Sequence, residues 1–149
     1  MTGGEKKDFA DFIAALNAQG VEYVIVGGYA VVFHGHVRFT KDIDILVRPT
    51  PRNAKRLMSA LKGFGFGGLG LKESDVRPGN IIQLGRPPNR IDLLMSIDGV
   101  DADAAWDERV MGSFLGQTAG FLSKERLIEN KKATGRTQDR ADAEALERE

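Results

Sequence analysis

The 149-residue sequence predicts an α+β fold, in which a small mixed β-sheet is flanked by helices and further helices follow at the C-terminal end. Apolar residues recur at helical spacing in several segments, and short β-branched runs alternate with those segments. Two neighbouring apolar runs in the middle of the chain are separated by a Pro-rich loop, which favours an antiparallel hairpin. We expect one domain over residues 1–149, with its core over about 20–97 and a helical part over about 101–149.

The first half of the chain alternates helical and extended patterns. An apolar stripe at helical spacing predicts a helix ending near Gly20. Its members are Phe9, Phe12, Ile13 and Leu16. The run EYVIV predicts a buried strand over about 22–26, stopped by Gly27-Gly28, and a short helix opened by these glycines follows. A second strand, IDILVR, ends at PTP, and residues 51–63 repeat the helical spacing.

The second half begins with the predicted hairpin, whose strands NIIQLG and RIDLLMSI are joined by residues 86–89. The segment 104–111 predicts a helix that Asp101 or Asp103 caps. Two final helices are expected over 123–134, with Ser123 as N-cap, and over about 138–148. The predicted order is therefore α-β-α-β-α-β-β-α-α-α.

Composition excludes several classes of function. Lys plus Arg and Asp plus Glu both number 21, so the zero net charge gives no bulk attraction for nucleic acid. The chain has no cysteine, which rules out disulfides, zinc-thiolate sites and cysteine nucleophiles. No apolar run approaches the ~20 residues of a membrane span, and the N-terminus lacks the apolar core of a signal peptide. We therefore expect a soluble, cytoplasmic protein without a membrane partner.

Two carboxylates stand at the entrance of the second strand. Asp42 and Asp44 project on the same side, because successive strand side chains alternate, and they lie roughly 7 Å apart along the strand. A third carboxylate, Asp92, belongs to the second strand of the hairpin. If these strands are neighbours, three carboxylates converge, and a hard divalent ion such as Mg²⁺ would offset their repulsion. A solvated strand edge is the structural alternative for Asp42 and Asp44.

The upstream glycines favour the functional interpretation. A strand that ends in Gly27-Gly28 lets the backbone approach a phosphate closely. A phosphate-binding turn, paired metal ligands and a third carboxylate are the components that phosphoryl transfer requires.

These residues resemble the nucleotidyltransferase superfamily related to DNA polymerase β. The stretch GGYAVVFHGHVRFTKDIDILV is similar to the small bacterial group that includes nucleotidyltransferase toxins of abortive-infection systems. The C-terminal pattern Lys-x-Ala-x-Gly-Arg-x-x-Asp-x-x-Asp of that group matches here as well. Its positions in this chain are Lys131, Ala133, Gly135, Arg136, Asp139 and Asp142.

The resemblance implies a single nucleotidyltransferase-like domain that uses an NTP and two Mg²⁺ ions. It implies Asp42, Asp44 and Asp92 as metal ligands and catalytic residues, with Asp92 deprotonating the acceptor. Gly27 and Gly28 would bind the triphosphate. Where many relatives carry Gly-Ser, this chain has Gly28, and position 138 is Gln138 where a basic residue is expected.

Other side chains have two interpretations each. Arg38 and Thr40 lie between the glycines and the carboxylates, and Arg38 either holds a phosphate bidentately or pairs with a surface carboxylate. Lys131 either contacts the triphosphate or is a solvated helix lysine. Arg136 with Asp139 or Asp142 is expected to be a structural ion pair, and His34 and His36 are expected to be structural rather than metal ligands. The glycine-rich segment 63–70 follows a helix rather than a strand, so we interpret it as a loop and not as a dinucleotide-binding turn.

The sequence thus predicts a Mg²⁺-dependent nucleotidyltransferase that moves an NMP from an NTP to a hydroxyl-type acceptor. RNA, a protein side chain and a small molecule all remain open as the acceptor, and a toxin paired with an antitoxin is one version of this hypothesis. The alternative is an inactive domain of the same fold that binds a nucleotide or a partner. A second copy of the chain or an antitoxin is the expected partner, since one short chain has little room for an acceptor-binding domain.

Overall fold

A computed structural model describes residues 2–85 and 90–148 and contains one mixed sheet of six strands in the spatial order β3-β4-β2-β1-β6-β5. β1 pairs antiparallel with β2 and parallel with β6, and β2 pairs parallel with β4. The β3–β4 and β5–β6 pairs are antiparallel. The strands are β1 (Tyr23–Val26), β2 (Ile43–Val47), β3 (Ile81–Leu84), β4 (Ile91–Leu94), β5 (Val110–Phe114) and β6 (Gln117–Phe121).

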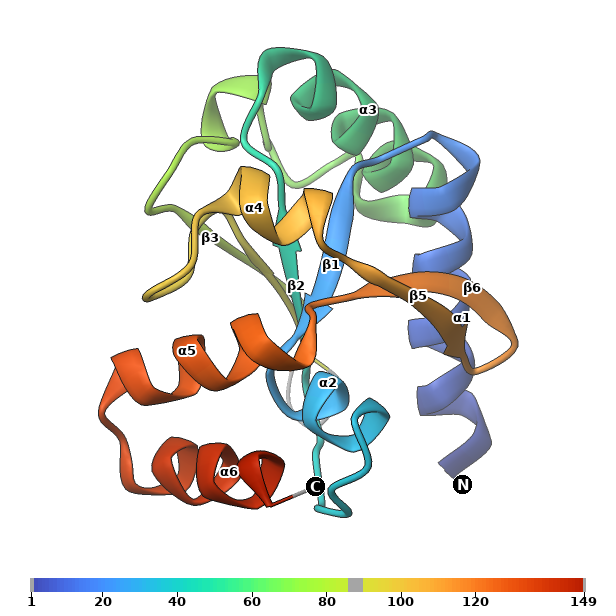
Figure 1. Cartoon of the computed structure of the whole chain (residues 1–149). Coiled ribbons are helices and arrows are strands. Elements are labelled where there is room, and N and C mark those ends of the chain that lie inside the picture. The colour runs from blue at the N-terminus through green and yellow to red at the C-terminus, as the bar shows by residue number, and fades with distance from the viewer. Residues whose placement is uncertain (1, 86–89, 149) are drawn as a thin grey trace.

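Helices cover both faces of this sheet (Figure 1). The α-helices are α1 (Thr2–Ala18), α2 (Gly27–Phe33), α3 (Pro51–Leu61), α4 (Ala102–Asp107), α5 (Lys124–Thr134) and α6 (Thr137–Glu147). One apolar cluster joins α1 and α3 to one face of the sheet, and a second joins α2, α4, α5 and α6 to the opposite face. The α+β class that the sequence predicts is therefore confirmed.

The apolar residues of the first predicted helix and of the two central strands lie where their spacing places them. Phe12, Ile13 and Leu16 are fully buried, in one cluster with Ile43 and Ile45 of β2 and Leu93 of β4. The predicted hairpin of the third and fourth strands is also confirmed, with Gln83 opposite Asp92, although its connection over 86–89 falls outside the described residues.

The prediction of a helix over 104–111 was wrong at its C-terminal end. Helix α4 ends at Asp107, and Val110 begins the edge strand β5. A tight connection at Leu115-Gly116, both with positive φ, returns the chain as β6. Gly112 allows this hairpin to pack closely, because an added Cβ would overlap the ring of Phe33. These contacts with distant aromatic residues outweigh the helix propensity of the preceding segment.

One short element occupies part of the glycine-rich region that was predicted to be a loop, and a second follows that region. The π-helical turn η1 (Lys62–Phe66) continues α3, and Gly65 within it has a φ of 106°. The 3₁₀ turn η2 (Glu73–Asp75) precedes β3. Since no strand leads into this segment, the structure agrees with the rejection of a dinucleotide-binding turn.

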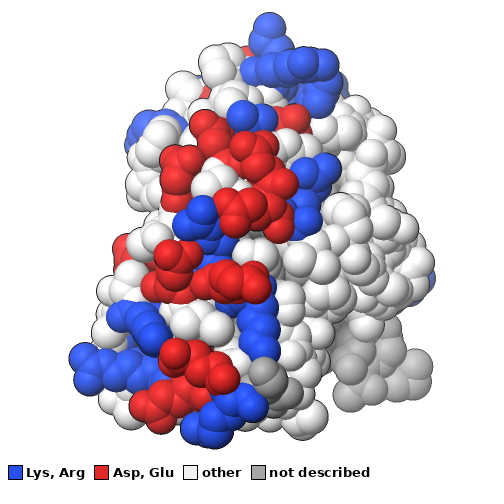
Figure 2. Space-filling view, in the orientation of Figure 1, with Lys and Arg blue, Asp and Glu red and all other residues white. Residues whose placement is uncertain are grey.

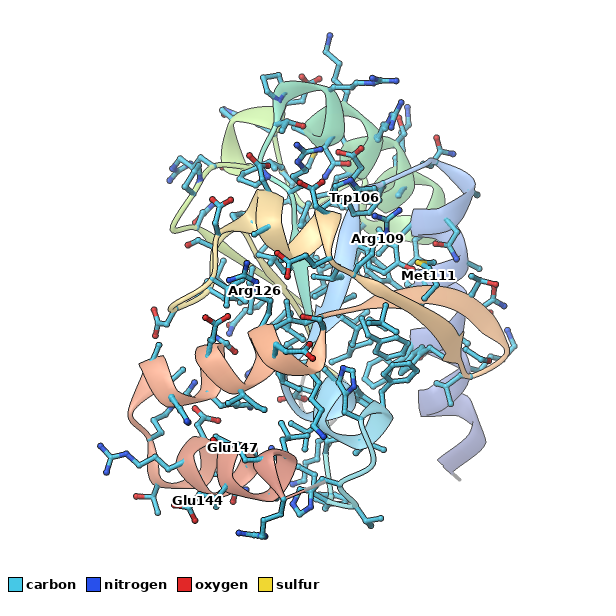
Figure 3. The ribbon with its side chains drawn as sticks, in the orientation of Figure 1. Trp106, Arg109, Met111, Arg126, Glu144 and Glu147 are labelled. Atoms are coloured by element: carbon cyan, nitrogen blue, oxygen red, sulfur yellow. The ribbon has the colours of Figure 1, made fainter. Side chains whose placement is uncertain are left out.

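An ion pair of Arg126 connects α5 to the C-terminal end of α4. Arg126 of α5 donates to Glu108 just beyond α4, at 2.7 Å, and to Glu129 on its own helix (Figure 3). Asp101 caps α4 by accepting from the Ala104 N–H, as the sequence predicts. Trp106 and Arg109 stack at 3.5 Å on the opposite side of the α4 end.

The face that carries α4, α5 and α6 shows acidic and basic side chains interspersed, and neither sign dominates it (Figure 2). This distribution agrees with the zero net charge of the sequence. In the described part of the chain, no helix has both the length and the apolar character that a membrane span needs.

Candidate active site

A cavity of ≈ 570 Å³ opens beside α2 at the N-terminal end of β2 and reaches toward the last two helices. The segment 38–42, strands β2 and β4, and helices α5 and α6 all contribute to its wall. Seven of the eight site residues that the sequence predicts line this cavity. They are Gly28, Arg38, Thr40, Asp42, Asp44, Asp92 and Lys131.

The eighth residue, Gly27, lines an adjoining cavity of ≈ 250 Å³ that shares Asp44 and Lys131 with the first. This second space has a more apolar wall, since Val26, Ile81 and Ile97 line it but not the first cavity. The two cavities therefore form adjacent compartments with Asp44 on both walls.

The three carboxylates meet because β2 and β4 are parallel neighbours. Asp44 and Asp92 are directly paired in register, and Asp42 lies one residue before β2 begins. Ile43 and Ile45 point to the opposite face and pack in the core, as the alternation of strand side chains requires. Asp92 is buried, whereas the Asp42 side chain keeps 29% of its surface exposed.

Burial, together with the neighbouring carboxylates, makes ionisation of Asp44 unfavourable. Burial is the main cause that raises the pKa of Asp44 to about 6, and the neighbouring carboxylates of Asp92 and Asp42 add to it. The Lys131 ammonium acts in the opposite direction without cancelling them. An added cation would relieve the repulsion and favour the ionised form.

Arg90 is a site residue that the sequence reasoning missed. Its Nε donates to Asp92 Oδ1 at 2.8 Å, and its Nη2 donates to Asp92 Oδ2 at 3.1 Å. The same Nη2 lies 3.5 Å from Asp42 Oδ2, while the Arg90 backbone N–H donates to Asp42 Oδ1. Hydrogen bonding to Asp92 raises the pKa of the guanidinium further. The spacing Arg90-x-Asp92 was a usable signal, because residues i and i+2 of a strand share a face.

The donor set fits a hard divalent ion, because Asp42, Asp44 and Asp92 offer only carboxylate oxygens at one end of two adjacent strands. Within residues 2–85 and 90–148, however, no three acidic or imidazole side chains are already arranged around a common point. Asp42 and Asp92 instead engage Arg90. Metal binding would therefore require these two carboxylates to exchange partners.

Both glycines are required by close packing. Gly27 has a φ of 65°, which favours glycine, and an added Cβ would overlap Asp44 Oδ2. A Cβ at Gly28 would stand 2.6 Å from Thr40 Oγ1. A serine at this position would therefore require Thr40 to move. Gly27 and Gly28 thus bring the chain after β1 against Asp44 and Thr40.

A buried ionic network forms part of the cavity wall and joins α5 to α6. Lys131 Nζ donates to Asp139 at 3.0 Å and lies 3.6 Å from Asp142, whose side chain is fully buried. Arg38 and Gln138 also donate to Asp142. Burial opposes the ionisation of Asp139, but the Thr134 hydroxyl and the Lys131 ammonium outweigh it and hold the pKa of that carboxyl below its usual range.

In this network Lys131 is buried rather than solvated, and Arg38 pairs with a carboxylate that is fully buried rather than at the surface. Arg136 forms the expected ion pair with Asp139 at 3.0 Å. His34 contacts the carbonyl of Leu122 through Nε2 at 2.7 Å, which agrees with a structural role. Thr40 lies at the cavity wall with its hydroxyl 3.4 Å from the Asp42 carbonyl.

Comparisons with known proteins agree with this geometry. The sequence model of the aminoglycoside-2''-adenylyltransferase family matches residues 9–134, which include all eight predicted site residues but not α6. No functionally curated protein matches the sequence significantly.

Two solved structures share the fold. The solution structure of the antibiotic-resistance factor ANT(2'')-Ia superposes with a TM-score of 0.60 at 16% identity, over 98% of this chain and 84% of that one. An antigenic nucleotidyltransferase-like protein from Paracoccidioides brasiliensis superposes with a TM-score of 0.53 at 17% identity, over 93% of this chain and 72% of that one. The family match covers most of the sequence, and the chain therefore belongs to the aminoglycoside-2''-adenylyltransferase family and is an enzyme of the nucleotidyltransferase class.

Proposed function

We propose that this protein transfers an NMP from an NTP to a hydroxyl-type acceptor and depends on Mg²⁺, with two ions bound by Asp42, Asp44 and Asp92. One observation carries the proposal: Asp44 and Asp92 are paired in register across parallel strands, with Asp42 beside them, on the wall of a cavity that Gly28 also lines. The raised pKa of Asp44 supports it, because a site that disfavours three negative charges gains most from a cation.

In the proposed reaction, the acceptor oxygen attacks the α-phosphorus of the NTP. The bond from that phosphorus to the oxygen bridging to the β-phosphate breaks, and pyrophosphate leaves with the electron pair. Asp92 accepts the proton of the acceptor hydroxyl. Mg²⁺ held by Asp42, Asp44 and Asp92 would supply neutralisation of the phosphate charge and Lewis acidity toward the acceptor hydroxyl.

Residues on the cavity wall would hold the triphosphate. Gly28 brings its backbone to the cavity surface, and Thr40 presents a hydroxyl next to it. Lys131 is the cation placed deepest, since α6 carboxylates hold its ammonium in the wall. Arg38 lines the same cavity and pairs with Asp142, and Gly27 belongs to the adjoining compartment.

An aminoglycoside is the first acceptor to test, because the family is named for that class of substrate. Aminoglycosides carry several positive charges, but on the described wall of the cavity no carboxylate is left over that would select such a polycation as the acceptor. The fourth carboxylate of that wall, Asp139, is already paired with Lys131 and Arg136, and the other three form the proposed metal site. RNA and protein acceptors, including those of a toxin with an antitoxin partner, belong in the same assay.

The assay supplies each of the four NTPs with Mg²⁺ and measures both pyrophosphate release and NMP incorporation into aminoglycosides, RNA and protein. We expect one NTP to be used, and we expect Asp44→Asn and Asp92→Asn to lower the rate by at least about a hundredfold. Asp107→Asn, at an exposed residue at the end of α4, is the matched control and should retain the activity.

Wild-type activity in Asp44→Asn or Asp92→Asn would overturn the proposal. Metal-dependent NTP binding without pyrophosphate release from any acceptor would point instead to a nucleotide-binding domain without turnover.

A further inference from the structure

Arg90 engages every oxygen of two proposed metal ligands. Its guanidinium takes both oxygens of Asp92, at 2.8 and 3.1 Å, and approaches Asp42 Oδ2 at 3.5 Å. Its backbone N–H takes the remaining oxygen, Asp42 Oδ1, at 3.2 Å. A divalent ion that binds Asp42 and Asp92 therefore meets the guanidinium charge at the same carboxylate oxygens.

The position of Arg90 allows its guanidinium to be displaced. The side chain keeps 29% of its surface exposed, and it is attached one residue before β4 begins, at the mouth of the cavity. The contact with Asp42 joins two partly exposed side chains and contributes little to folding, whereas the contact with the buried Asp92 is the stronger one to exchange. Lys131, whose ammonium favours the ionised form of Asp44, is 7% exposed and anchored by two α6 carboxylates. Arg90 is thus the exchangeable cation and Lys131 the permanent one.

We propose that Arg90 is an internal counter-ion that holds Asp42 and Asp92 when no divalent ion is bound and competes with the metal for them. The inference rests on the proposed function only in taking these carboxylates as metal ligands. An incoming triphosphate offers the displaced guanidinium a new anionic partner within the same cavity, because planar guanidinium groups bind phosphate bidentately. Nucleotide and metal then favour each other's binding through Arg90.

The first test is a calorimetric titration with Mg²⁺, repeated with Mn²⁺, in the absence of nucleotide. Arg90→Gln should bind the metal roughly tenfold more tightly than the wild type, because Asp42 and Asp92 lose their competitor. Arg90→Lys retains the charge but cannot form the bidentate hydrogen bonds, and its metal affinity should lie between those of the wild type and Arg90→Gln.

Lys41→Gln is the matched control. Lys41 lines the same cavity and carries the same charge, but its ammonium lies over the Phe39 ring at 5.9 Å. It should change the metal affinity less than about twofold, because only the general field of the cavity is altered. Equal tightening in Lys41→Gln and Arg90→Gln, or an Arg90→Gln affinity within about twofold of the wild type, would overturn the proposal.

A second titration adds a non-hydrolysable NTP analogue. With the analogue bound, the difference in metal affinity between the wild type and Arg90→Gln should become smaller, because Arg90 of the wild type then binds phosphate. An unchanged difference would contradict the proposed movement of Arg90 from the carboxylates to the phosphate. Neither titration needs turnover. Failure of the transfer assay and failure of this competition are therefore separate results.

Discussion

Asp44 and Asp92 face each other across the parallel pair β2 and β4, and the main effects of this arrangement are the burial of Asp44 and the repulsion between two carboxylates. The strands that bring the two residues together are held by apolar side chains on their other face, such as Ile45 and Leu93. The folding of the apolar core thus places the carboxylates of Asp44 and Asp92 close together, and these carboxylates are two of the proposed metal ligands.

The raised pKa of Asp44 predicts how stability depends on pH in metal-free protein. A carboxyl group with a folded pKa of about 6 and an unfolded value of 3.8 binds its proton more tightly when folded. Its contribution to the free energy of unfolding is therefore greatest below about pH 4 and is lost as the pH rises through 6. Asp44→Asn should raise the free energy of unfolding by about 2 kcal/mol at pH 8 and by much less at pH 4.5.

Urea denaturation in EDTA at these two pH values measures this difference. Asp107→Asn, on the exposed end of α4, should show no such pH-dependent gain. A gain for Asp44→Asn that is equal at both pH values would contradict the assignment.

Adding a single methyl group at Gly27 is expected to lower the free energy of unfolding substantially. In Gly27→Ala, the positive φ and the overlap with Asp44 act together, and we expect a loss of about 3 kcal/mol in the free energy of unfolding. Gly70→Ala shares the positive φ but has open space, so about 1 kcal/mol is expected. Gly63→Ala has neither feature and should be nearly neutral. Thermal or urea unfolding of the three variants tests this order, and equal losses for Gly27 and Gly70 would show that the contact with Asp44 does not matter.

Lys131 and its neighbour Lys132 form a matched pair for the buried network. Lys131→Met leaves Asp139 and Asp142 without their shared ammonium, and a loss of about 3 kcal/mol in stability is expected. Lys132→Met breaks only an exposed pair with Glu147 and should cost less than about 0.5 kcal/mol (Figure 3). Equilibrium unfolding at pH 7 measures both, and similar values for the two variants would argue against an energetic role for the network.

We expect the Phe39 ring to contact the nucleoside part of the substrate. It is the one aromatic side chain on the described wall of the main cavity, and 78% of it is exposed. Stacking of a base on this ring would make Phe39→Ala weaken NTP binding roughly tenfold while leaving tripolyphosphate binding unchanged.

Val37→Ala is the control for Phe39→Ala, since Val37 is 90% exposed on the same segment but does not line the cavity. Calorimetric titration of each variant with an NTP and with tripolyphosphate separates the two contributions. Equal weakening for both ligands would show that Phe39 acts on the triphosphate or on the shape of the segment.

The hairpin β5–β6 shows where sequence reasoning stops. Val110 and Met111 follow a genuine helix, and local spacing continues that helix through them. They become a strand because Phe121 of β6 joins the sheet beside Ile25 and stacks on Phe33 at 3.9 Å, which are contacts between residues far apart in the chain. The sequence pattern of a short segment cannot predict contacts with residues far away in the chain.

By itself the sequence determined the α+β class, the faces of β2 and β4, and the identity of the three carboxylates, because alternation along a strand and periodicity along a helix are local properties. Only the tertiary structure decided which charges are neighbours. It paired Arg38 with Asp142, buried Lys131 between α5 and α6, and placed Arg90 on Asp42 and Asp92. Ion pairs act through space over a few ångströms, whereas sequence patterns record only the order of residues, so these partnerships emerge when strands and helices distant in the chain are packed together.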